Sequence, residues 1–388
     1  IYPDELGLIF SGSAVVDKNN TSGFGKDGIA PIVAMFTYHN MDGEKAGKID
    51  FQTQAIAYSL DEGMTWTKYD KNPVISNPGM KDFRDPKVIW DAKSNKWIMV
   101  LAAANKVLFY SSKNLKEWDL ESEFGQDVGQ HGGMWECPDL FPIKIDGTDE
   151  TKWVLIVSIN PAAPNGGSGT QYFIGDFDGK TFTSENDKDK TLWADWGGDF
   201  YAGQTWNEMP DSRRIWVGWL NNWRYANEIP TTVWRGSFSI PRQVGLTQTP
   251  EGIRLTQKPI PELEELRGEH QNWQNEKITP SAKFTPEFQG SSFEIIAEFQ
   301  ASQNITADRF GLRLRSGAEE KTTIGYATKA SRIICISCIA HTYECRNHLD
   351  MAEPNCSSFS RRSRTIIVTS APQPRIRSKV TSTANYAL

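Results

Sequence analysis

The sequence has little cysteine, no long apolar run and no excess of positive charge. Only five of its 388 residues are cysteine, and Cys137 is the only one in the first 330. A disulfide framework therefore does not organise most of the chain. No run of about 18 apolar residues occurs, which predicts no membrane partner. The net charge is −6 and the first 300 residues contain no basic stripe, which predicts no nucleic-acid partner.

Aromatic and turn-forming residues are abundant instead. The chain has 14 Trp, 19 Phe and 11 Tyr, together with 31 Gly and 20 Pro. Short runs of aromatic and β-branched residues, broken by Gly, Pro, Asn and Asp, are typical of strands and turns. We assign about four in five of the rings to the core, because aromatic side chains bury so much area. The composition predicts an all-β fold.

A weak internal repeat indicates how these strands are arranged. Residues 57–66 and 109–118 both read aromatic, Ser, polar turn, Trp, and Trp66 and Trp118 are 118 − 66 = 52 residues apart. Residues 175–182 form a partial third copy. A period near 50, with about four strands in each period, is typical of a β-propeller blade. The simpler alternative is a chance recurrence of common turn residues.

Changes in composition divide the chain into domains. We predict a β-propeller over residues 1–257, a linker over 258–275 and a β-sandwich over 276–388. Clean alternation stops near residue 326, so we expect residues 327–388 to be disordered or foreign to the native coding sequence. The zinc-like pattern formed by Cys335, Cys338, His341, Cys345 and His348 lies in that tail, and we predict no metal site and no cofactor.

Two acidic residues lie in unusual surroundings. Glu136 stands between Trp135 and Cys137 in an otherwise apolar run, and Asp85 lies between Arg84 and a proline. Each acid alone is most simply a solvated surface charge. However, the two are 136 − 85 = 51 residues apart, which is one predicted blade, so equivalent positions on neighbouring blades would converge on one axis. A pair of carboxyl groups, one carrying its proton, is the usual requirement for cleaving a glycosidic bond.

Around these acids the chain resembles glycoside hydrolase family 32, most closely the bacterial levanases and exo-inulinases. Five segments match in the family's order, and the resemblance covers roughly residues 1–326. The segments are Phe-Ser-Gly-Ser-Ala at 10–14, Phe-Arg-Asp-Pro-Lys at 83–87, Trp-Glu-Cys-Pro-Asp at 135–139, Asp-Phe-Tyr-Ala-Gly-Gln-Thr-Trp at 199–206, and Trp-Arg at 234–235 with Ser-Ile-Pro-Arg at 239–242.

The resemblance implies a five-bladed β-propeller, with its first blade incomplete here, followed by an incomplete C-terminal β-sandwich. It implies a retaining β-fructosidase that releases fructose from levan, inulin or sucrose. Glu136 matches the acid/base and Asp85 the carboxylate that stabilises the transition state. The implied substrate-binding residues are Phe10, Ser11, Arg84, Cys137, Tyr201, Trp206 and Trp234.

The sequence departs from the family at the nucleophile. The family's nucleophile is an Asp in a Trp-Met-Asn-Asp-Pro-Asn-Gly motif, which this sequence does not contain, and Asp4 is no substitute for it. We therefore expect an N-terminally truncated form of a secreted enzyme that is poorly active or inactive. A fructosyltransferase and a catalytically inactive fructan-binding propeller remain as alternatives. The sequence makes no prediction of oligomeric state.

Overall fold

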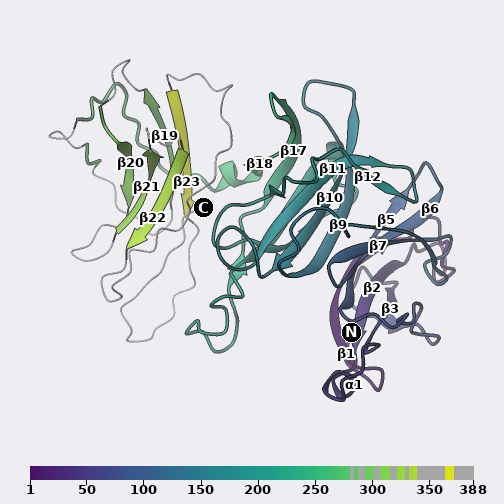
Figure 1. The fold of residues 1–388 in the computed structure, drawn as a ribbon. Helices are drawn as coiled ribbons and strands as arrows, with labels where there is room; N and C mark the ends of the chain where they lie inside the picture. Colours follow the sequence, from purple (N-terminus) through teal and green to yellow (C-terminus); the bar gives the residue numbers. More distant parts are fainter. Residues whose placement is uncertain are drawn as a thin grey trace. The chain divides into compact units, whose positions relative to one another are not determined.

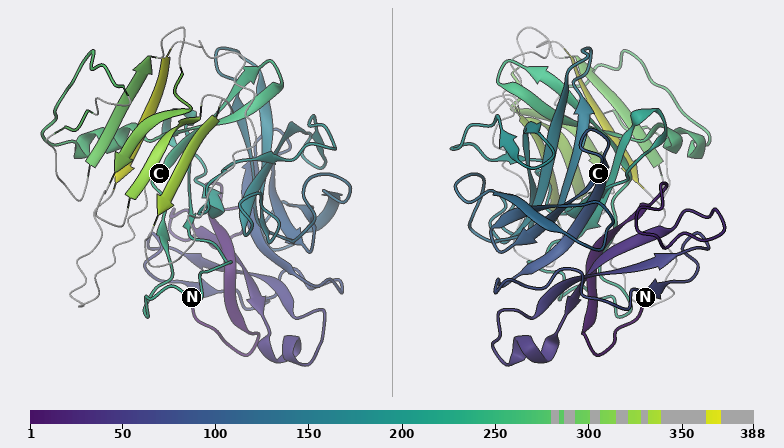
Figure 2. Two further views of the ribbon diagram at one scale, coloured as in Figure 1. Left: turned by 60° about the vertical axis from the view of Figure 1, so that its left-hand side comes forward. Right: turned by 90° about the vertical axis from the view of Figure 1, so that its right-hand side faces the viewer.

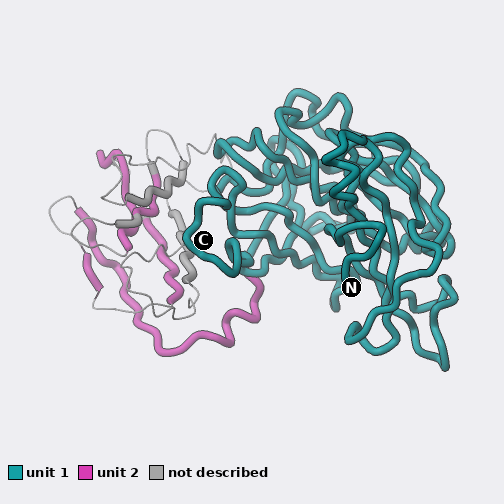
Figure 3. The backbone as a smooth tube through the Cα atoms, turned by 90° about the horizontal axis from the view of Figure 1, so that it is seen from below, with its two compact units in different colours: residues 1–258 teal, residues 259–388 magenta. Residues whose placement is uncertain are grey.

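The structure, a computed structural model, describes residues 1–279, 284–286, 293–300, 306–314, 321–327, 332–338 and 363–370. The chain divides into two compact units, residues 1–258 and 259–388 (Figure 3). Strands dominate both, and the described helical segments are α1 (Met41–Lys45), η1 (Pro210–Ser212) and η2 (Pro261–Leu266). This confirms the predicted all-β class. Most of the tail for which we expected disorder, including His341, Cys345 and His348, lies outside the described residues.

The first half of unit 1 forms two four-stranded antiparallel sheets, each a simple meander in which neighbours in sequence pair (Figure 1). Their strands, in spatial order, are β1 (Leu8–Val16), β2 (Ile32–His39), β3 (Gln52–Ser59) and β4 (Thr67–Lys68), then β5 (Phe83–Asp91), β6 (Lys96–Ala103), β7 (Lys106–Ser112) and β8 (Asp119–Phe124).

The second half of unit 1 repeats this pattern twice, with one additional short strand in each sheet. The third sheet contains β9 (Met134–Lys144), β10 (Thr151–Asn160), β11 (Gly169–Phe177) and β12 (Phe182–Ser184), with β13 (Leu192–Trp193) pairing β11. The fourth contains β14 (Tyr201–Thr205), β15 (Arg214–Leu220), β17 (Arg242–Thr249) and β18 (Gly252–Pro259), with β16 (Ser237–Phe238) pairing β15.

The first strands of the four sheets lie side by side, which gives unit 1 a β-propeller arrangement. β1 packs beside β5, β5 beside β9 and β9 beside β14. Figure 2 shows the sheets succeeding one another in sequence order, from purple through blue to teal. The residues that begin each meander therefore converge, as the spacing of Asp85 and Glu136 predicts.

The number of blades differs from the expected five. The described residues form four blades, and the first of them, β1–β4, has all four strands, so no described sheet corresponds to the incomplete first blade that we expected. The sequence repeat reports the length of a blade but not how many blades there are. The count of five came from the resemblance alone.

The repeated Trp motif lies in the same place in the first two blades. Trp66 directly precedes β4 and Trp118 directly precedes β8. The Trp66 indole N–H donates to the Gly63 carbonyl at 2.9 Å, and that of Trp118 donates to the Leu115 carbonyl at 3.0 Å. The repeat is therefore a recurring turn in which an indole closes the connection between the third and fourth strands of a blade.

Apolar side chains from adjacent blades form a core at each junction. One cluster joins the first and second sheets, including Val33 and Met99. A second joins the second and third sheets, including Phe109 and Leu155. A third, which includes Trp216, joins the third and fourth sheets. Each described junction therefore buries apolar area, which is the main favourable contribution to its stability.

The described strands of unit 2 form two separate antiparallel sheets. β19 (Phe293–Gln300) pairs β23 (Ser363–Ser370), and β20 (Arg309–Leu314), β21 (Lys321–Ala327) and β22 (Arg332–Cys338) form the other sheet. Phe293, Ile295 and Phe299 from the first sheet pack in one cluster with Leu312, Leu314 and Ile324 from the second. The two sheets therefore share an apolar layer.

A buried ion pair connects the inner strands of three blades. The Lys87 ammonium on β5 donates to Asp139 Oδ2 on β9 at 3.2 Å and to the Thr205 carbonyl on β14 at 2.6 Å, while the Thr205 N–H donates to Asp139 Oδ2 at 2.7 Å. The side chains of Lys87 and Asp139 are 5% and 0% exposed. Burial lowers the pKa of the Lys87 amine, and the Asp139 charge opposes that change.

We predict that Lys87→Met destabilises unit 1 by about 3–5 kcal/mol, because it leaves the Asp139 carboxylate buried without its cation. The matched control is Lys144→Met, which removes an ion pair of the same 3.2 Å length between side chains that are 66% and 104% exposed. The control should cost less than about 1 kcal/mol. Urea unfolding followed by tryptophan fluorescence measures both, since Trp273 is the only tryptophan outside unit 1. Equal losses in the two variants would contradict the expectation.

Candidate active site

In each of the four sheets of unit 1 the innermost strand is interrupted by a bulge, and most of the predicted site residues lie at these bulges. In β1 the register shifts between Ile9 and Gly12, in β5 between Arg84 and Lys87, and in β14 between Tyr201 and Gln204. In β9 the residues after Glu136 bulge opposite the β10 segment between Ile156 and Ser158. A bulge changes the direction of its side chains, so residues that alternation would distribute over two faces can face one site.

Three of the bulges contain a non-glycine residue in the left-handed region of backbone space. These residues are Asp85 (φ 64°), Cys137 (φ 48°) and Ala202 (φ 53°). Such a backbone costs of order 1–3 kcal/mol and persists only where its surroundings hold it. Each of these N–H groups donates to a side chain of the preceding blade: Asp85 to Thr37 Oγ1 at 3.1 Å, Cys137 to Asp85 Oδ2 at 2.9 Å and Ala202 to Ser158 Oγ at 3.0 Å. The preceding blade therefore fixes each bulge.

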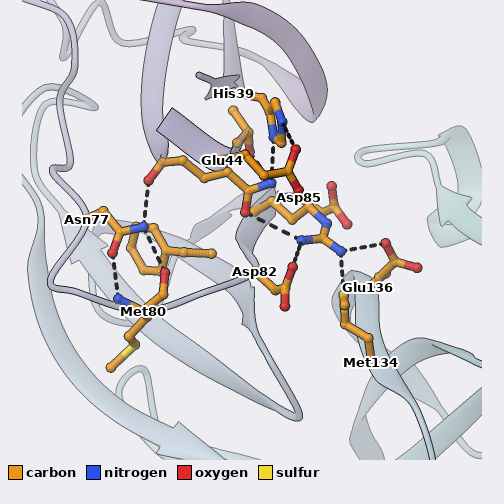
Figure 4. Close-up of polar contacts among 12 residues, drawn as sticks. His39, Glu44, Asn77, Met80, Asp82, Asp85, Met134 and Glu136 are labelled. Atoms are coloured by element: carbon orange, nitrogen blue, oxygen red, sulfur yellow. Dashed lines mark hydrogen bonds and ion pairs between the residues drawn. The ribbon is translucent and has the colours of Figure 1, made fainter. Parts of the chain in front are cut away.

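Glu136 lies between a cation and a hydroxyl. Arg84 donates from Nη2 to Glu136 Oε1 at 2.9 Å and from Nη1 to Asp82 Oδ1 at 2.7 Å, and it also approaches the Met134 sulfur (Figure 4). The Tyr201 hydroxyl donates to the other oxygen, Glu136 Oε2. Two other blades, the second and the fourth, thus supply the groups that hold this one carboxyl.

The charges around Glu136 keep its two donors protonated. Burial opposes the charge of Arg84, but the hydrogen bonds and charges of Asp82 and Glu136 outweigh it and raise the pKa of Arg84. Burial, and then the Glu136 charge, raise the pKa of the Tyr201 hydroxyl well above its ordinary value. Both groups therefore remain hydrogen-bond donors over the range in which enzymes work.

Asp85 is the second carboxyl of the site, and it is only 6% exposed. Its Oδ2 accepts the Cys137 N–H at 2.9 Å and faces the Cys137 thiol at 3.5 Å. Burial raises the pKa of Asp85, while the Cys137 N–H and the Arg84 charge act in the opposite direction. Burial and the charges of Asp85 and Glu136 raise the pKa of the Cys137 thiol, so this cysteine is no thiolate nucleophile.

The predicted substrate-binding residues are only partly brought together. Phe10, 37% exposed, stacks on His39 at the first bulge, next to the exposed Ser11. Trp206 follows β14, Trp234 lies between β15 and β16, and their side chains are 47% and 44% exposed. Within residues 1–279, no hydrogen bond or ring contact of these two tryptophan side chains joins them to Glu136 or Asp85.

Several residues of the site carry no signal that the sequence analysis recognised. Asp82 shares the Arg84 guanidinium with Glu136, and Thr37, His39 and Gln52 approach the site from β2 and β3. Asp82 could have been suspected from the charged Asp-Phe-Arg-Asp run at 82–85. The other three come from a different blade, so no local pattern connects them to Glu136.

Glu136, partly exposed, and Asp85, buried, form a pair of carboxyl groups with a fixed arginine and tyrosine on the inner strands of the blades, and such a set can carry out acid/base chemistry. Comparison with known families defines it further. The pattern described as "Glycosyl hydrolases family 32 N-terminal domain" matches residues 2–259, and the one described as "Glycosyl hydrolases family 32 C terminal" matches residues 262–336. The chain belongs to glycosyl hydrolase family 32.

Individual proteins agree with this membership. A levanase of Bacillus subtilis (strain 168) is 51% identical over 337 residues, which are 86% of this chain and 48% of the levanase. An extracellular exo-inulinase of Aspergillus ficuum is 41% identical over 345 residues, 83% of this chain and 64% of that protein. The crystal structure of exo-inulinase from Aspergillus awamori matches with a TM-score of 0.73 and 35% identity, covering 94% of this chain and 74% of that one. The chain thus spans about half to two thirds of the length of these curated relatives.

The helices in the described part of the chain are all too short or too polar to cross a membrane.

Asp199, two residues before Tyr201, provides a test of the electrostatics near the site. Burial, followed by the Asp195 charge, raises the pKa of Asp199 to about 6, and its Oδ1 is buried without a hydrogen-bond partner. The folded chain therefore binds more protons than the unfolded chain between about pH 4 and pH 6, and stability falls as the pH rises through that window.

We predict that Asp199→Asn stabilises unit 1 by about 1–2 kcal/mol at pH 7 and by much less at pH 4, where the wild-type carboxyl is protonated in the folded state and about half protonated in the unfolded state. Urea midpoints at the two pH values measure the difference. Asp189→Asn, a change at an exposed carboxyl, is the matched control and should have no effect at either pH. A gain of equal size at pH 4 and pH 7 would show that the charge of Asp199 is not the cause.

Proposed function

We propose that this chain carries the acid/base half of a β-fructosidase active site, which releases fructose from fructan or sucrose. The observation that carries the proposal is Glu136, held between the guanidinium of Arg84 and the hydroxyl of Tyr201 beside the buried carboxyl of Asp85. Relatives described as a levanase and an exo-inulinase support the choice of a fructosyl substrate.

Glu136 acts twice in the proposed reaction. It first gives its proton to the leaving oxygen of the fructosidic bond, and as a carboxylate it then takes a proton from the attacking water. Arg84 and Tyr201 each bind one oxygen of this carboxyl and fix its position. This matters because a proton donor contributes only when it lies within hydrogen-bond reach of the leaving oxygen.

Asp85 has a different role because of its surroundings. Its buried carboxyl points one oxygen at the Cys137 N–H, which leaves Oδ1 to accept hydroxyl groups of the sugar ring. Hydrogen bonds that strengthen as positive charge develops on the ring stabilise the transition state. Phe10 and Ser11 are assigned to the wall of the fructose pocket, and Trp206 and Trp234 to its outer lining.

A retaining mechanism also needs a carboxylate nucleophile about 5–5.5 Å from the acid/base. Asp4 is not a candidate for this role, because it accepts the Tyr38 hydroxyl at 2.6 Å and forms an ion pair with Lys68 at 2.5 Å. The resemblance described in the sequence analysis implies a nucleophile in a Trp-Met-Asn-Asp-Pro-Asn-Gly motif, which this sequence does not contain. We propose that catalysis requires a segment carrying that motif, in addition to the residues described above.

We infer that such a segment would also complete a fifth blade. Apolar cores join the first sheet to the second, the second to the third and the third to the fourth, whereas among the described residues no apolar core joins the fourth sheet to the first. Phe238, on the fourth sheet, is 81% exposed. Unit 2, with its shared apolar layer, is proposed to be a β-sandwich, and the extracellular relatives support secretion.

The test compares two proteins: this chain, and this chain extended N-terminally by the homologous segment of the Bacillus subtilis levanase that carries the Asp motif. Fructose release from levan, inulin and sucrose is measured for both, together with the thermal midpoint. We expect activity and a higher midpoint only in the extended protein. Glu136→Gln in that protein should lower kcat by about 10²–10⁴-fold.

Glu117→Gln, a change of the same type on an exposed turn, is the control and should leave kcat unchanged. The loss in Glu136→Gln should be smaller on an aryl fructoside, whose leaving group needs no proton. If the extended, folded protein is inert on all three substrates, the β-fructosidase proposal fails and the fructan-binding propeller becomes the better account. Growth of fructan chains in place of fructose release would instead support a fructosyltransferase.

A further inference from the structure

A line of hydrogen bonds runs from the protein surface to Arg84 through side chains of the first blade. His39 Nε2 lies 3.0 Å from Glu44 Oε2, and His39 Nδ1 lies 3.1 Å from Gln52 Nε2. Gln52 Oε1 accepts from Arg84 Nη1 at 3.4 Å (Figure 4). His39 is 3% exposed, whereas the Glu44 side chain is 47% exposed. The line therefore begins in solvent on α1 and ends at the group that binds Glu136.

The chemistry of the partners fixes the direction of every bond in this line. Arginine can only donate, so the Gln52 oxygen faces Arg84 and the Gln52 amide nitrogen faces His39. The amide nitrogen can only donate, so His39 Nδ1 must be the acceptor and must carry no proton. The ring proton then lies on Nε2, which donates to Glu44. A single tautomer of His39 satisfies the whole line.

The same imidazole also supports the predicted pocket wall. Phe10 stacks on it with ring centroids 4.1 Å apart and an angle of 8° between the planes. Phe51 packs against it edge to face, at 5.2 Å and 73°. His39 is therefore held by packing against two rings and by hydrogen bonds at both of its nitrogens, and it cannot turn without breaking several contacts.

Gln52 is equally constrained. It pairs directly with His39 across β2 and β3, and its backbone carbonyl accepts the Asn77 side-chain amide at 2.8 Å. Arg84 has two carboxylate partners, Asp82 and Glu136, and Gln52 is an uncharged partner of its Nη1. A neutral acceptor on Nη1 helps to fix the plane of the guanidinium without adding a third negative charge. The plane decides whether Nη2 points at Glu136.

We propose that His39 is a positioning residue of the active site. Held as its Nε2–H tautomer between Glu44 and Gln52, it orients Arg84 toward Glu136 and supports the ring of Phe10. This inference rests on the proposed function only in the choice of the activity that is measured. The arrangement of His39, Gln52 and Arg84 can be tested without any substrate.

The first test reads the tautomer directly by NMR of the chain with ¹⁵N-labelled histidine rings. The chain has five histidines, and the His39→Phe variant assigns the His39 signals. We expect one neutral form with its proton on Nε2 and a hydrogen-bonded Nδ1. Gln52→Leu should shift Nδ1 to the position of a free ring nitrogen. A proton on Nδ1, or a mixture of the two tautomers, would overturn the proposal.

The second test asks whether His39 and Gln52 act through the same line. In the form of the protein that releases fructose, His39→Phe keeps an aromatic ring against Phe10 and removes both nitrogens, and Gln52→Leu cuts the line next to Arg84. Each should lower kcat/KM by about 10- to 100-fold, mainly through kcat, because Glu136 loses its alignment. The double variant should lose no more than the worse single variant, since both changes break one line.

Two controls separate positioning from general damage. Glu44→Gln keeps an oxygen that accepts the Nε2–H, so its kcat should stay within about twofold of the parent. Gln248→Leu makes the same change at an exposed position of β17 and should have no effect. Losses that multiply in the double variant, or no loss in either single variant, would overturn the positioning role. If every form of the protein is inert, the proposed function fails while the NMR result still decides the tautomer.

Discussion

The site depends on one repeated backbone constraint, a bulge in the innermost strand of each blade. In three blades the bulge contains a residue with positive φ, and its N–H cannot join the ladder of its own sheet. It therefore binds a side chain of the preceding blade, such as Thr37 or Ser158. The packing of the blades therefore also determines the geometry of the site, because a bulge is stable only if the neighbouring blade places a hydrogen-bond acceptor within reach of its N–H. Asp85 is such an acceptor and a site residue at once.

The buried charges are distributed in two layers along these inner strands. At the bulges, one cation, Arg84, faces Asp82, Asp85 and Glu136, so negative charge exceeds positive charge. A few residues further along the same strands, Lys87 and Asp139 form a closed pair with the backbone of Thr205. The closed pair holds the strands together, whereas the unbalanced layer keeps carboxyl groups available for chemistry. This excess of negative charge lowers the stability of the folded chain, and the apolar cores between the blades must offset that loss.

The sequence predicted much of the fold and several residues of the candidate site, and the features that it did not predict have identifiable physical causes. The strands, the blade period and the Trp66 and Trp118 turns are local features, determined by alternation and turn chemistry within about ten residues. Glu136, Asp85, Arg84 and Tyr201 were found because they stand in short matched segments, and the structure does bring these four together. The count of five blades was not met by the described residues, because a period in the sequence does not define how many copies close a ring. His39 and Gln52 were not predicted as site residues because no sequence pattern around them indicates a contact with Arg84.

The sequence by itself determined the all-β class, the length of a blade, the membership of the family and a candidate pair of carboxyl groups, because each of these depends on neighbours in the chain. The tertiary structure alone decided which groups surround those carboxyls: Tyr201 from the fourth blade and Arg84 from the second touch Glu136, and Gln52 from the first blade binds Arg84. Arg84 and Tyr201 lie 52 and 65 positions from Glu136, and Gln52 lies 32 positions from Arg84 on a neighbouring blade. Only the packing of one sheet against the next specifies such pairs, and no local pattern of residues encodes them.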